Sequence, residues 1–109
     1  MSDVARNRAY WDGASEEYQR RHAERITHPD TRWGMWQIPD AELGVLDDVA
    51  GLDVLELGCG AGQFGLTLAS RGARVIGLDV SEKQLDGARA NGVDFPLVLG
   101  SADAAPFSD

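Results

Sequence analysis

The stretch Val54-Leu55-Glu56-Leu57-Gly58-Cys59-Gly60-Ala61-Gly62 decides the fold. It begins as a short apolar run with one acid, which is typical of a buried strand, and it ends with glycine at alternate positions. Without Cβ atoms, Gly58, Gly60 and Gly62 can adopt positive φ and let a ligand lie against main-chain N–H and C=O groups. A helix is predicted from about residue 63, and its positive end would face the same ligand. The stretch therefore predicts a nucleotide-binding turn.

Two kinds of ligand are compatible with such a turn. Residues 60–65 satisfy the dinucleotide pattern G-x-G-x-x-G, and Asp79 follows where a ribose-binding acid is expected. In that pattern the first glycine closes the strand, whereas here the glycines start earlier, at Gly58, and the acid Glu56 precedes them. A carboxylate at the strand end repels a pyrophosphate and attracts a cationic group. The pattern favours a ligand with a positively charged end, and an NAD(P)-dependent oxidoreductase is the less favoured alternative.

The motif Glu-x-Gly-x-Gly-x-Gly resembles motif I of the class I S-adenosylmethionine-dependent methyltransferases, in particular the small-molecule, type 11 members. The cofactor of that family carries an ammonium and a sulfonium but no phosphate, which agrees with the charge argument. The resemblance implies that S-adenosylmethionine is the cofactor and that Glu56 lies near its methionine end. An alternative for Glu56 is a carboxylate that only accepts backbone N–H bonds at the helix start. The same resemblance assigns cofactor contacts to Gly58, Cys59, Gly60 and Gly62.

Two later segments resemble further motifs of the same family. Residues 74–81, Arg-Val-Ile-Gly-Leu-Asp-Val-Ser, are similar to its second strand, which implies that Asp79 accepts from the ribose hydroxyls and that Val80 packs on the adenine. Asp79 could instead cap the following helix, but Ser81 is better placed for that role. Residues 100–109 are similar to the family segment G-[DS]-A-E-x-L-P-F-x-D. This implies that Ser101 and the N–H of Ala102 contact the adenine edge, with Ser a weaker acceptor than the usual Asp.

Residues from about 4 to 24 are predicted to form a helix. Tyr10, Trp11, Ala14 and Tyr18 recur at spacings of three and four, so they line one stripe of it. The segment from Trp11 to Tyr18 resembles the F-D-x-x-A-x-x-Y signature at the start of many small-molecule methyltransferases. That resemblance implies that Tyr18 closes over the cofactor, and ordinary helix packing is the alternative.

Other side chains that could take part in binding or catalysis give weaker signals. Trp33 and Trp36 belong to an apolar cluster inside a loop, and they either wall a substrate pocket or fill space beneath the loop. Cys59 has no basic neighbour that would activate its thiol, so we interpret it as a small apolar filler. His22 and His28 lack a third ligand nearby, so no metal site is predicted. The sequence identifies no catalytic residue.

After residue 49 strands and helices alternate in the prediction, at 53–57, 63–70, 74–78, 81–90 and 95–99. Ser81 to Gln84 has the form of a capping box. A short helix is predicted to start at Pro39, with Leu43 and Leu46 repeating on one face of it. Parallel strands joined by single helices predict an α/β fold with a Rossmann-like, doubly wound sheet. We expect an N-terminal helical cap over residues 1–48 and a truncated cofactor-binding domain over residues 49–109.

The resemblance also implies that the fold is partial. In the family the sheet has seven strands in the order 3-2-1-4-5-7-6, so this chain would supply only the 3-2-1 half. Its first strand, central in the family, would be an edge with unpaired N–H and C=O groups. We therefore expect part of a longer methyltransferase that is inactive alone and self-associates through the exposed strand edge.

Composition limits the partners. In 109 residues, 18 acids against 10 bases give a net charge of −8, which disfavours binding to nucleic acid or to an anionic membrane surface. No apolar stretch approaches the ~20 residues of a membrane span, and no secretory signal pattern is recognised, so a cytoplasmic location is expected. The expected function is methyl transfer from S-adenosylmethionine to an unidentified small molecule. A non-catalytic nucleotide-binding or interaction module is the alternative.

Overall fold

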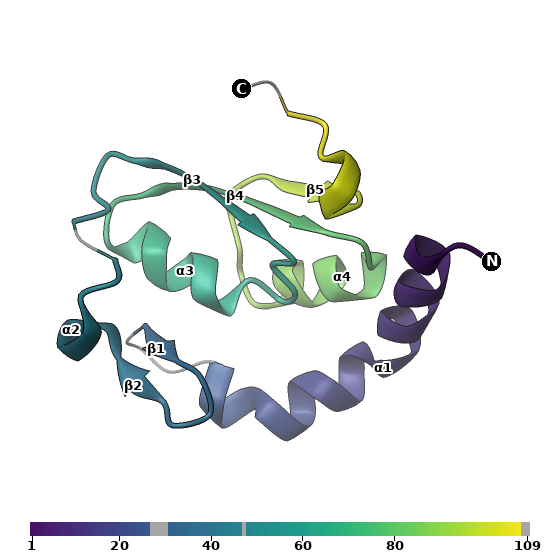
Figure 1. Cartoon of the computed structure of the whole chain (residues 1–109), viewed down its shortest axis with the longest axis horizontal. Coiled ribbons are helices and arrows are strands. Elements are labelled where there is room, and N and C mark those ends of the chain that lie inside the picture. The colour runs from purple at the N-terminus through teal and green to yellow at the C-terminus, as the bar shows by residue number, and fades with distance from the viewer. Residues whose placement is uncertain (27–30, 47, 108–109) are drawn as a thin grey trace.

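The computed structural model describes residues 1–26, 31–46 and 48–107. Its elements, shown in Figure 1, are in chain order α1 (Asp3–Ile26), β1 (Arg32–Trp33), β2 (Ile38–Pro39), α2 (Asp40–Leu43), β3 (Asp53–Leu57), α3 (Gln63–Ser70), β4 (Arg74–Asp79), α4 (Glu82–Ala90), β5 (Leu97–Leu99) and the 3₁₀ turn η1 (Ala102–Ala104). Helices α3 and α4 cover one side of the main sheet, and α1 and the hairpin β1–β2 lie beyond them on the same side.

The main sheet is parallel and has the strand order β3-β4-β5. The predicted strand-helix-strand-helix-strand half of a Rossmann-like fold is therefore confirmed, with β4 in the middle and β3 at an edge. Strand β5 is shorter than predicted, because it begins at Leu97 and not at residue 95. The reason is Pro96, which has no N–H to give to a ladder. Its carbonyl oxygen still accepts from the N–H of Gly77, at 2.9 Å.

The core lies between the sheet and its two helices. Val49, Leu68, Ala73 and Val75 are buried together, and partly buried side chains such as Phe95 pack against them. Further along, Leu85 and Ala88 of α4 are fully buried. Glycines let the helices approach the sheet closely. A Cβ on Gly65 of α3 would stand 2.7 Å from Cζ of Phe95, which is closer than real contacts allow.

Helix α4 begins with only half of the predicted capping box. Oγ of Ser81 accepts from the N–H of Gln84 at 3.3 Å, as predicted. The Gln84 side chain does not return to the N–H of Ser81, which instead donates to Oδ1 of Asp79 at 2.9 Å. The amide of Gln84 is thereby left to bind α1, a contact that local sequence patterns do not show.

Helix α1 packs against α4, and its orientation differs in part from the predicted stripe. Ser15 is buried, whereas Tyr10, which was predicted on the packed face, is 64% exposed. Trp11 and Tyr18 are half-buried and stay on the packed side. Within the described ranges, none of the helices combines the length and apolar character that a membrane crossing requires.

Residues 31–46 contain a short antiparallel hairpin where a loop was predicted. A buried carboxylate organises it. Asp40 Oδ1 accepts from Nε1 of Trp33 at 2.9 Å and from the N–H groups of Val45 and Leu46 at 3.1 and 3.0 Å. These hydrogen bonds lower the pKa of Asp40. The carboxylate therefore joins the hairpin to the segment that leads into β3.

Helix α2 is shorter than the periodicity of Leu43 and Leu46 predicted. Pro39 is its N-cap residue and not its first helical residue, and Gly44 ends it in a left-handed conformation with φ 64°. A glycine at this position commonly terminates helices, because it carries no Cβ penalty. Leu46 consequently lies outside the helix, although it still packs against the core.

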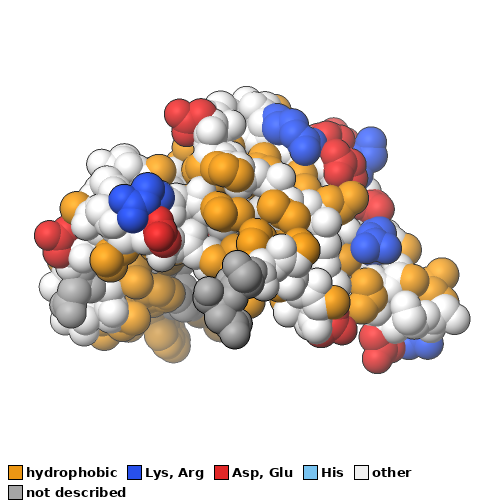
Figure 2. Space-filling view, turned by 90° about the horizontal axis from the view of Figure 1, so that it is seen from above, with side chains coloured by type: hydrophobic (Ala, Val, Ile, Leu, Met, Phe, Trp, Pro, Cys, Tyr) orange, Lys and Arg blue, Asp and Glu red, His pale blue; other side chains and the backbone are white. Residues whose placement is uncertain are grey.

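The face of the sheet opposite α3 and α4 carries no helix among the described residues, as Figure 1 shows. The strand register places Leu55 beside Ile76 and Leu57 beside Leu78 on that face. Leu55 and Leu57 of the edge strand are 42% and 53% exposed. Figure 2, which looks onto this side, shows apolar side chains gathered across it. The molecule thus presents an apolar sheet face next to an open strand edge.

The close approach of α3 predicts opposite effects for two helical glycines. Gly65→Ala should lower the free energy of unfolding by about 1 kcal/mol, because overpacking against Phe95 costs about 1–3 kcal/mol and helix propensity returns about 1 kcal/mol. Gly87→Ala in α4 is the matched control. Its Cβ would meet only Ala61, at 3.4 Å, so it should raise stability by up to about 1 kcal/mol. Thermal unfolding measures both, and equal stabilisation by the two would contradict the packing described.

Candidate functional site

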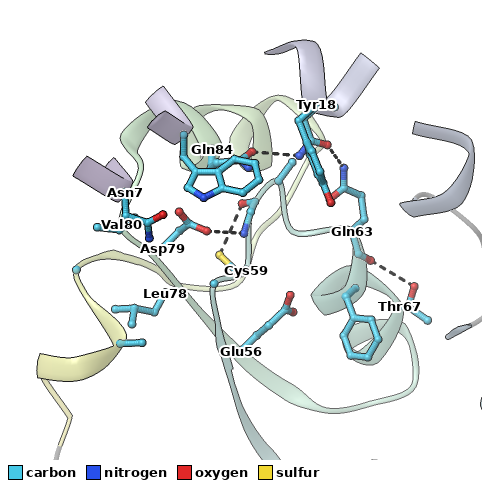
Figure 3. Close-up of a pocket in the computed structure, with 18 of the residues that line it drawn as sticks. Asn7, Tyr18, Glu56, Cys59, Gln63, Thr67, Leu78, Asp79, Val80 and Gln84 are labelled. Atoms are coloured by element: carbon cyan, nitrogen blue, oxygen red, sulfur yellow. Dashed lines mark hydrogen bonds between the residues drawn. The ribbon is translucent and has the colours of Figure 1, made fainter. Parts of the chain in front are cut away.

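A cleft of about 630 Å³ opens where the carboxyl ends of β3, β4 and β5 face α1 and the hairpin. Figure 3 shows side chains from α1, β3, β4 and the first turns of α3 and α4 converging on it. In open α/β sheets ligands bind at this end of the strands. Of the residues predicted to bind a cofactor, the cleft is lined by Tyr18, Glu56, Gly58, Cys59, Gly60, Asp79, Val80, Ser101 and Ala102.

The glycine-rich turn has the positive φ values that the sequence predicted. Gly58, Gly60 and Gly62 have φ of 69°, 56° and 78°. Gly58 and Gly60 line the cleft, so a ligand there would meet main chain. Gly62 does not line it. A Cβ on Gly62 would stand 2.6 Å from Cγ2 of Val93, so this glycine permits packing behind the turn.

Asp79 holds the turn in place. Its Oδ2 accepts from the N–H of Gly60 at 2.9 Å, and its Oδ1 accepts from the N–H of Ser81 at 2.9 Å. The second bond shows that Asp79 also stabilises the start of α4, whereas capping of this helix was predicted for Ser81 alone. Each carboxylate oxygen can accept more than one hydrogen bond, so Asp79 keeps capacity for a ligand that donates.

Glu56 points into the cleft from β3, as Figure 3 shows. Its Oε2 is buried and has no hydrogen-bond partner among the residues that the structure describes. The alternative in which this carboxylate accepts backbone N–H bonds at the helix start therefore finds no support at Oε2. Burial, and next the charge of Asp79, raise the pKa of Glu56 from 4.5 to about 7. A cationic group in the cleft would relieve both effects.

Cys59 behaves as a buried filler. Its N–H donates to the carbonyl of Leu78 at 2.9 Å, which fixes the turn to β4. Burial, followed by the charges of Glu56 and Asp79, raises the pKa of its thiol to about 12. A thiol with so high a pKa is a poor nucleophile, because the thiolate is the reactive form.

Val80, Ser101 and Ala102 line the end of the cleft beyond Asp79. The hydroxyl of Ser101 donates to the carboxylate of Asp103. Its oxygen lone pairs remain available, so it can accept from a ligand amino group while a nearby negative charge polarises it. The carbonyl of Val80 accepts from Nε of Arg8 at 3.0 Å, which ties α1 to this end of the cleft.

Tyr18 covers the cleft from α1. Its ring packs edge-on against Trp11 with centroids 5.1 Å apart and stacks on His22 at 4.5 Å. Trp11 itself lines the cleft, although the sequence argument had assigned it only a place in the helical stripe. Trp11 and Tyr18 of α1 thus form part of one wall of the site.

The other candidates lie elsewhere. Trp33 does not line the cleft, and its ring packs against Phe64 with centroids 5.4 Å apart. Trp36 lies in the turn of the hairpin, is 84% exposed and does not line the cleft. No cluster of potential metal ligands occurs in the part of the chain that the structure describes. His28 lies outside the described residues.

Several polar residues of the cleft are not predicted from the sequence: Asn7, Gln19, Thr31, Arg32, Gln37, Gln63, Thr67 and Gln84. Most of them come from α1, the hairpin and the first turns of α3 and α4. The half capping box at Ser81 was the one local signal for Gln84. Side chains of α1 reach the cleft only because that helix crosses α4, and such a crossing leaves no local pattern.

The raised pKa of Glu56 predicts a pH-dependent stability. Because the folded state holds this proton more tightly than the unfolded chain, ionisation of Glu56 opposes folding. The free energy of unfolding should fall as the pH rises from about 5 to about 8, with Glu56 contributing on the order of 2–3 kcal/mol. Glu56→Gln should lose this contribution, and the exposed control Glu42→Gln should keep it. Urea unfolding at several pH values measures the difference, and an unchanged slope in Glu56→Gln would contradict the burial of this carboxylate.

Comparisons with known proteins agree with this geometry. The profile of the methyltransferase domain family matches residues 54–109. An uncharacterised methyltransferase of Synechocystis sp. is 44% identical over 59 residues, which cover 54% of this chain and 28% of that protein. The ubiquinone biosynthesis O-methyltransferase of Azoarcus sp. is 43% identical over 63 residues, covering 52% of this chain and 27% of that protein. The chain thus spans about a quarter of the length of these relatives.

A solved structure extends the likeness over most of the fold. The magnesium protoporphyrin IX methyltransferase of Synechocystis PCC 6803, solved with bound SAM, superposes with a TM-score of 0.58 and 25% identity. The match covers 91% of this chain and 54% of that one. The matched family segment begins inside β3 and includes the glycine-rich turn, Asp79 and Ser101. This chain belongs to the methyltransferase domain family.

Proposed function

We propose that the cleft binds S-adenosylmethionine and that the chain is the cofactor-binding part of an enzyme that methylates a small molecule. The observation that carries the proposal is Glu56, which lines the cleft and whose buried Oε2 has no hydrogen-bond partner among the described residues. An isolated buried carboxylate oxygen is costly unless something compensates it. A ligand with an ammonium and a sulfonium would do so, whereas the phosphates of NAD(P) would add repulsion. The solved relative with bound SAM supports the same choice.

The positions of the cleft residues suggest one orientation for the cofactor. The ribose hydroxyls would donate to Asp79, and the cationic methionine end would lie towards Glu56. The adenine would pack on Val80, with its edge at Ser101 and the N–H of Ala102. Gly58, Cys59 and Gly60 would lie along the middle of the ligand, while Gly62 lets Val93 pack behind the turn.

Two parts of the chain would share this task. Residues 49–109 would supply the sheet, the turn and the polar contacts, and residues 1–48 would cap the site through α1, with Tyr18 over the ligand. The sulfonium supplies an activated methyl group, so the protein needs mainly to align the acceptor with it. No residue in the described part of the chain is assigned as a base. The acceptor would be a small molecule.

The proposal predicts selective ligand binding. Isothermal calorimetry should detect S-adenosylhomocysteine and S-adenosylmethionine but not NAD. Asp79→Ala should weaken binding at least about 10-fold, because it removes a charge-assisted acceptor and loosens the turn. Asp53→Ala is the matched control, since its carboxylate is exposed and pairs with Arg74 away from the cleft. Glu56→Gln should weaken S-adenosylmethionine more than S-adenosylhomocysteine, which lacks the sulfonium charge.

Two results would contradict the proposal. Binding of NAD with no binding of S-adenosylhomocysteine would favour an oxidoreductase. Equal losses in Asp79→Ala and Asp53→Ala would place the ligand outside this cleft. Circular dichroism of each variant provides the necessary check that the chain is folded.

A second role rests on the open strand β3. We propose that copies of the chain associate through this edge and the apolar face beside it, because unpaired edges and exposed apolar patches both favour pairing. Leu55→Lys should therefore shift the chain towards monomer in light scattering after gel filtration. Val45→Lys changes a similarly exposed side chain away from the main sheet and should have no effect. A wild-type monomer with a sharp two-state thermal transition would refute this role.

A further inference from the structure

Gln84 is a buried polar residue that the proposed contacts do not use. It lies in the first turn of α4 and is only 5% exposed. Its Oε1 accepts two hydrogen bonds from α1, from Oγ of Ser15 at 2.9 Å and from Nε2 of Gln19 at 3.1 Å. A buried amide with two partners on one helix is held in a single orientation. Helix α1 therefore fixes which end of the Gln84 amide faces the cleft.

The hydrogen bonds run in one direction across the mouth of the site. Nε2 of Gln63, the first residue of α3, donates to Oε1 of Gln19, and Nε2 of Gln19 donates to Oε1 of Gln84. This glutamine relay, Gln63–Gln19–Gln84, ends in the Nε2 of Gln84. In Figure 3 the relay borders the cleft above the glycine-rich turn.

The free end of the relay points to the ligand side of the turn. Nε2 of Gln84 would lie 3.8 Å from a Cβ placed on Gly60, and Gln84 lines the cleft. The side-chain hydrogen bonds of Gln84 to α1 both end on Oε1 and do not use this Nε2. On the same side, the carboxylate of Asp79 accepts from the N–H of Gly60. A ligand that lies against Gly60 would therefore meet one acceptor and one donor, which suits a pair of neighbouring hydroxyl groups.

Several polar contacts hold α1 on α4. Besides the bonds to Gln84, Oγ of Ser81 donates to Asp12 at 2.6 Å, and Arg8 donates to the carbonyl of Val80. Each such bond replaces bonds to water and contributes about 0.5–1.5 kcal/mol net. Because water can replace each of these bonds, α1 can leave and return without leaving its polar groups unpaired.

We propose that Gln84 is a binding residue for the nucleoside hydroxyls and that it couples ligand binding to the seating of α1. The inference rests on the proposed function. When α1 is seated, Ser15 and Gln19 hold Oε1 and present Nε2 to the ligand. When α1 is displaced, the amide turns freely and the donor is no longer pre-oriented. By linkage, the ligand stabilises seated α1 by the same factor by which α1 strengthens ligand binding. A neutral hydrogen bond sets that factor at about 3–10-fold.

Ser15 allows a clean test, because it bonds to Gln84 but does not line the cleft. The experiment is a double-mutant cycle on the affinity for S-adenosylhomocysteine, with Ser15→Ala, Gln84→Met and the two combined. Methionine retains the volume of the glutamine side chain but no amide. Ser70→Ala is the control, since Ser70 is exposed on α3. Ser15→Ala should weaken binding about 3–10-fold in the wild type and have no further effect in Gln84→Met.

Hydrogen exchange supplies a second readout that a purely structural role of Gln84 would not change. Addition of S-adenosylhomocysteine should slow amide exchange in α1 of the wild type, and this ligand-dependent protection should be several-fold smaller in Gln84→Met, where Tyr18 still covers the ligand but the amide is absent. The coupling is overturned if Ser15→Ala has the same effect in both backgrounds, or no effect in a wild type that binds. If the wild type does not bind S-adenosylhomocysteine while remaining folded, the proposed function and the role of Gln84 both fail. Binding that needs Asp79 but shows no coupling overturns the role of Gln84 alone.

Discussion

The arrangement of the site depends on the carboxylate of Asp79, which joins three segments that are separate in the sequence. One oxygen holds the glycine-rich turn at Gly60 and the other holds the start of α4 at Ser81, each at 2.9 Å. Because Asp79 ends the middle strand, these bonds set the turn and the helix relative to the sheet. The floor of the cleft is thus fixed before any ligand arrives, which reduces the ordering cost of binding.

Much of this part of the fold could be predicted from local patterns. The turn, the three strands and the positions of α3 and α4 followed from glycine spacing, apolar runs and the N-cap at Ser81. Strand β5 begins later than predicted because Pro96 has no N–H to donate to the ladder. The prediction followed the apolar pattern and did not take this proline into account. The resemblance to the methyltransferase family rested on the same local features. The sequence could therefore indicate the family, and it could indicate most of the residues between 49 and 109 that line the cleft.

The N-terminal part could not be predicted as well, because its structure depends on contacts between distant residues. The hairpin is organised by the buried Asp40, whose bonds to Trp33 and Leu46 follow no periodicity. Trp33 is consequently turned towards Phe64 and not into the cleft. The bonds from Ser15 and Gln19 to Gln84 span 69 and 65 positions in the sequence. A short polar residue in a helix gives no sign of such a partner.

The two acids of the cleft explain why a ligand would stabilise the protein. Burial, and next the charge of Asp79, raise the cost of ionising Glu56, which has a buried oxygen with no partner among the described residues. Asp79 itself accepts from two backbone N–H groups. The pKa of Glu56 near 7 means that the empty cleft retains a proton there at mildly acidic pH. A cationic ligand would replace that proton and keep both carboxylates charged. The same unsatisfied group that weakens the free protein therefore favours a positively charged ligand over a phosphate-bearing one, and it does so through the fold's own electrostatics.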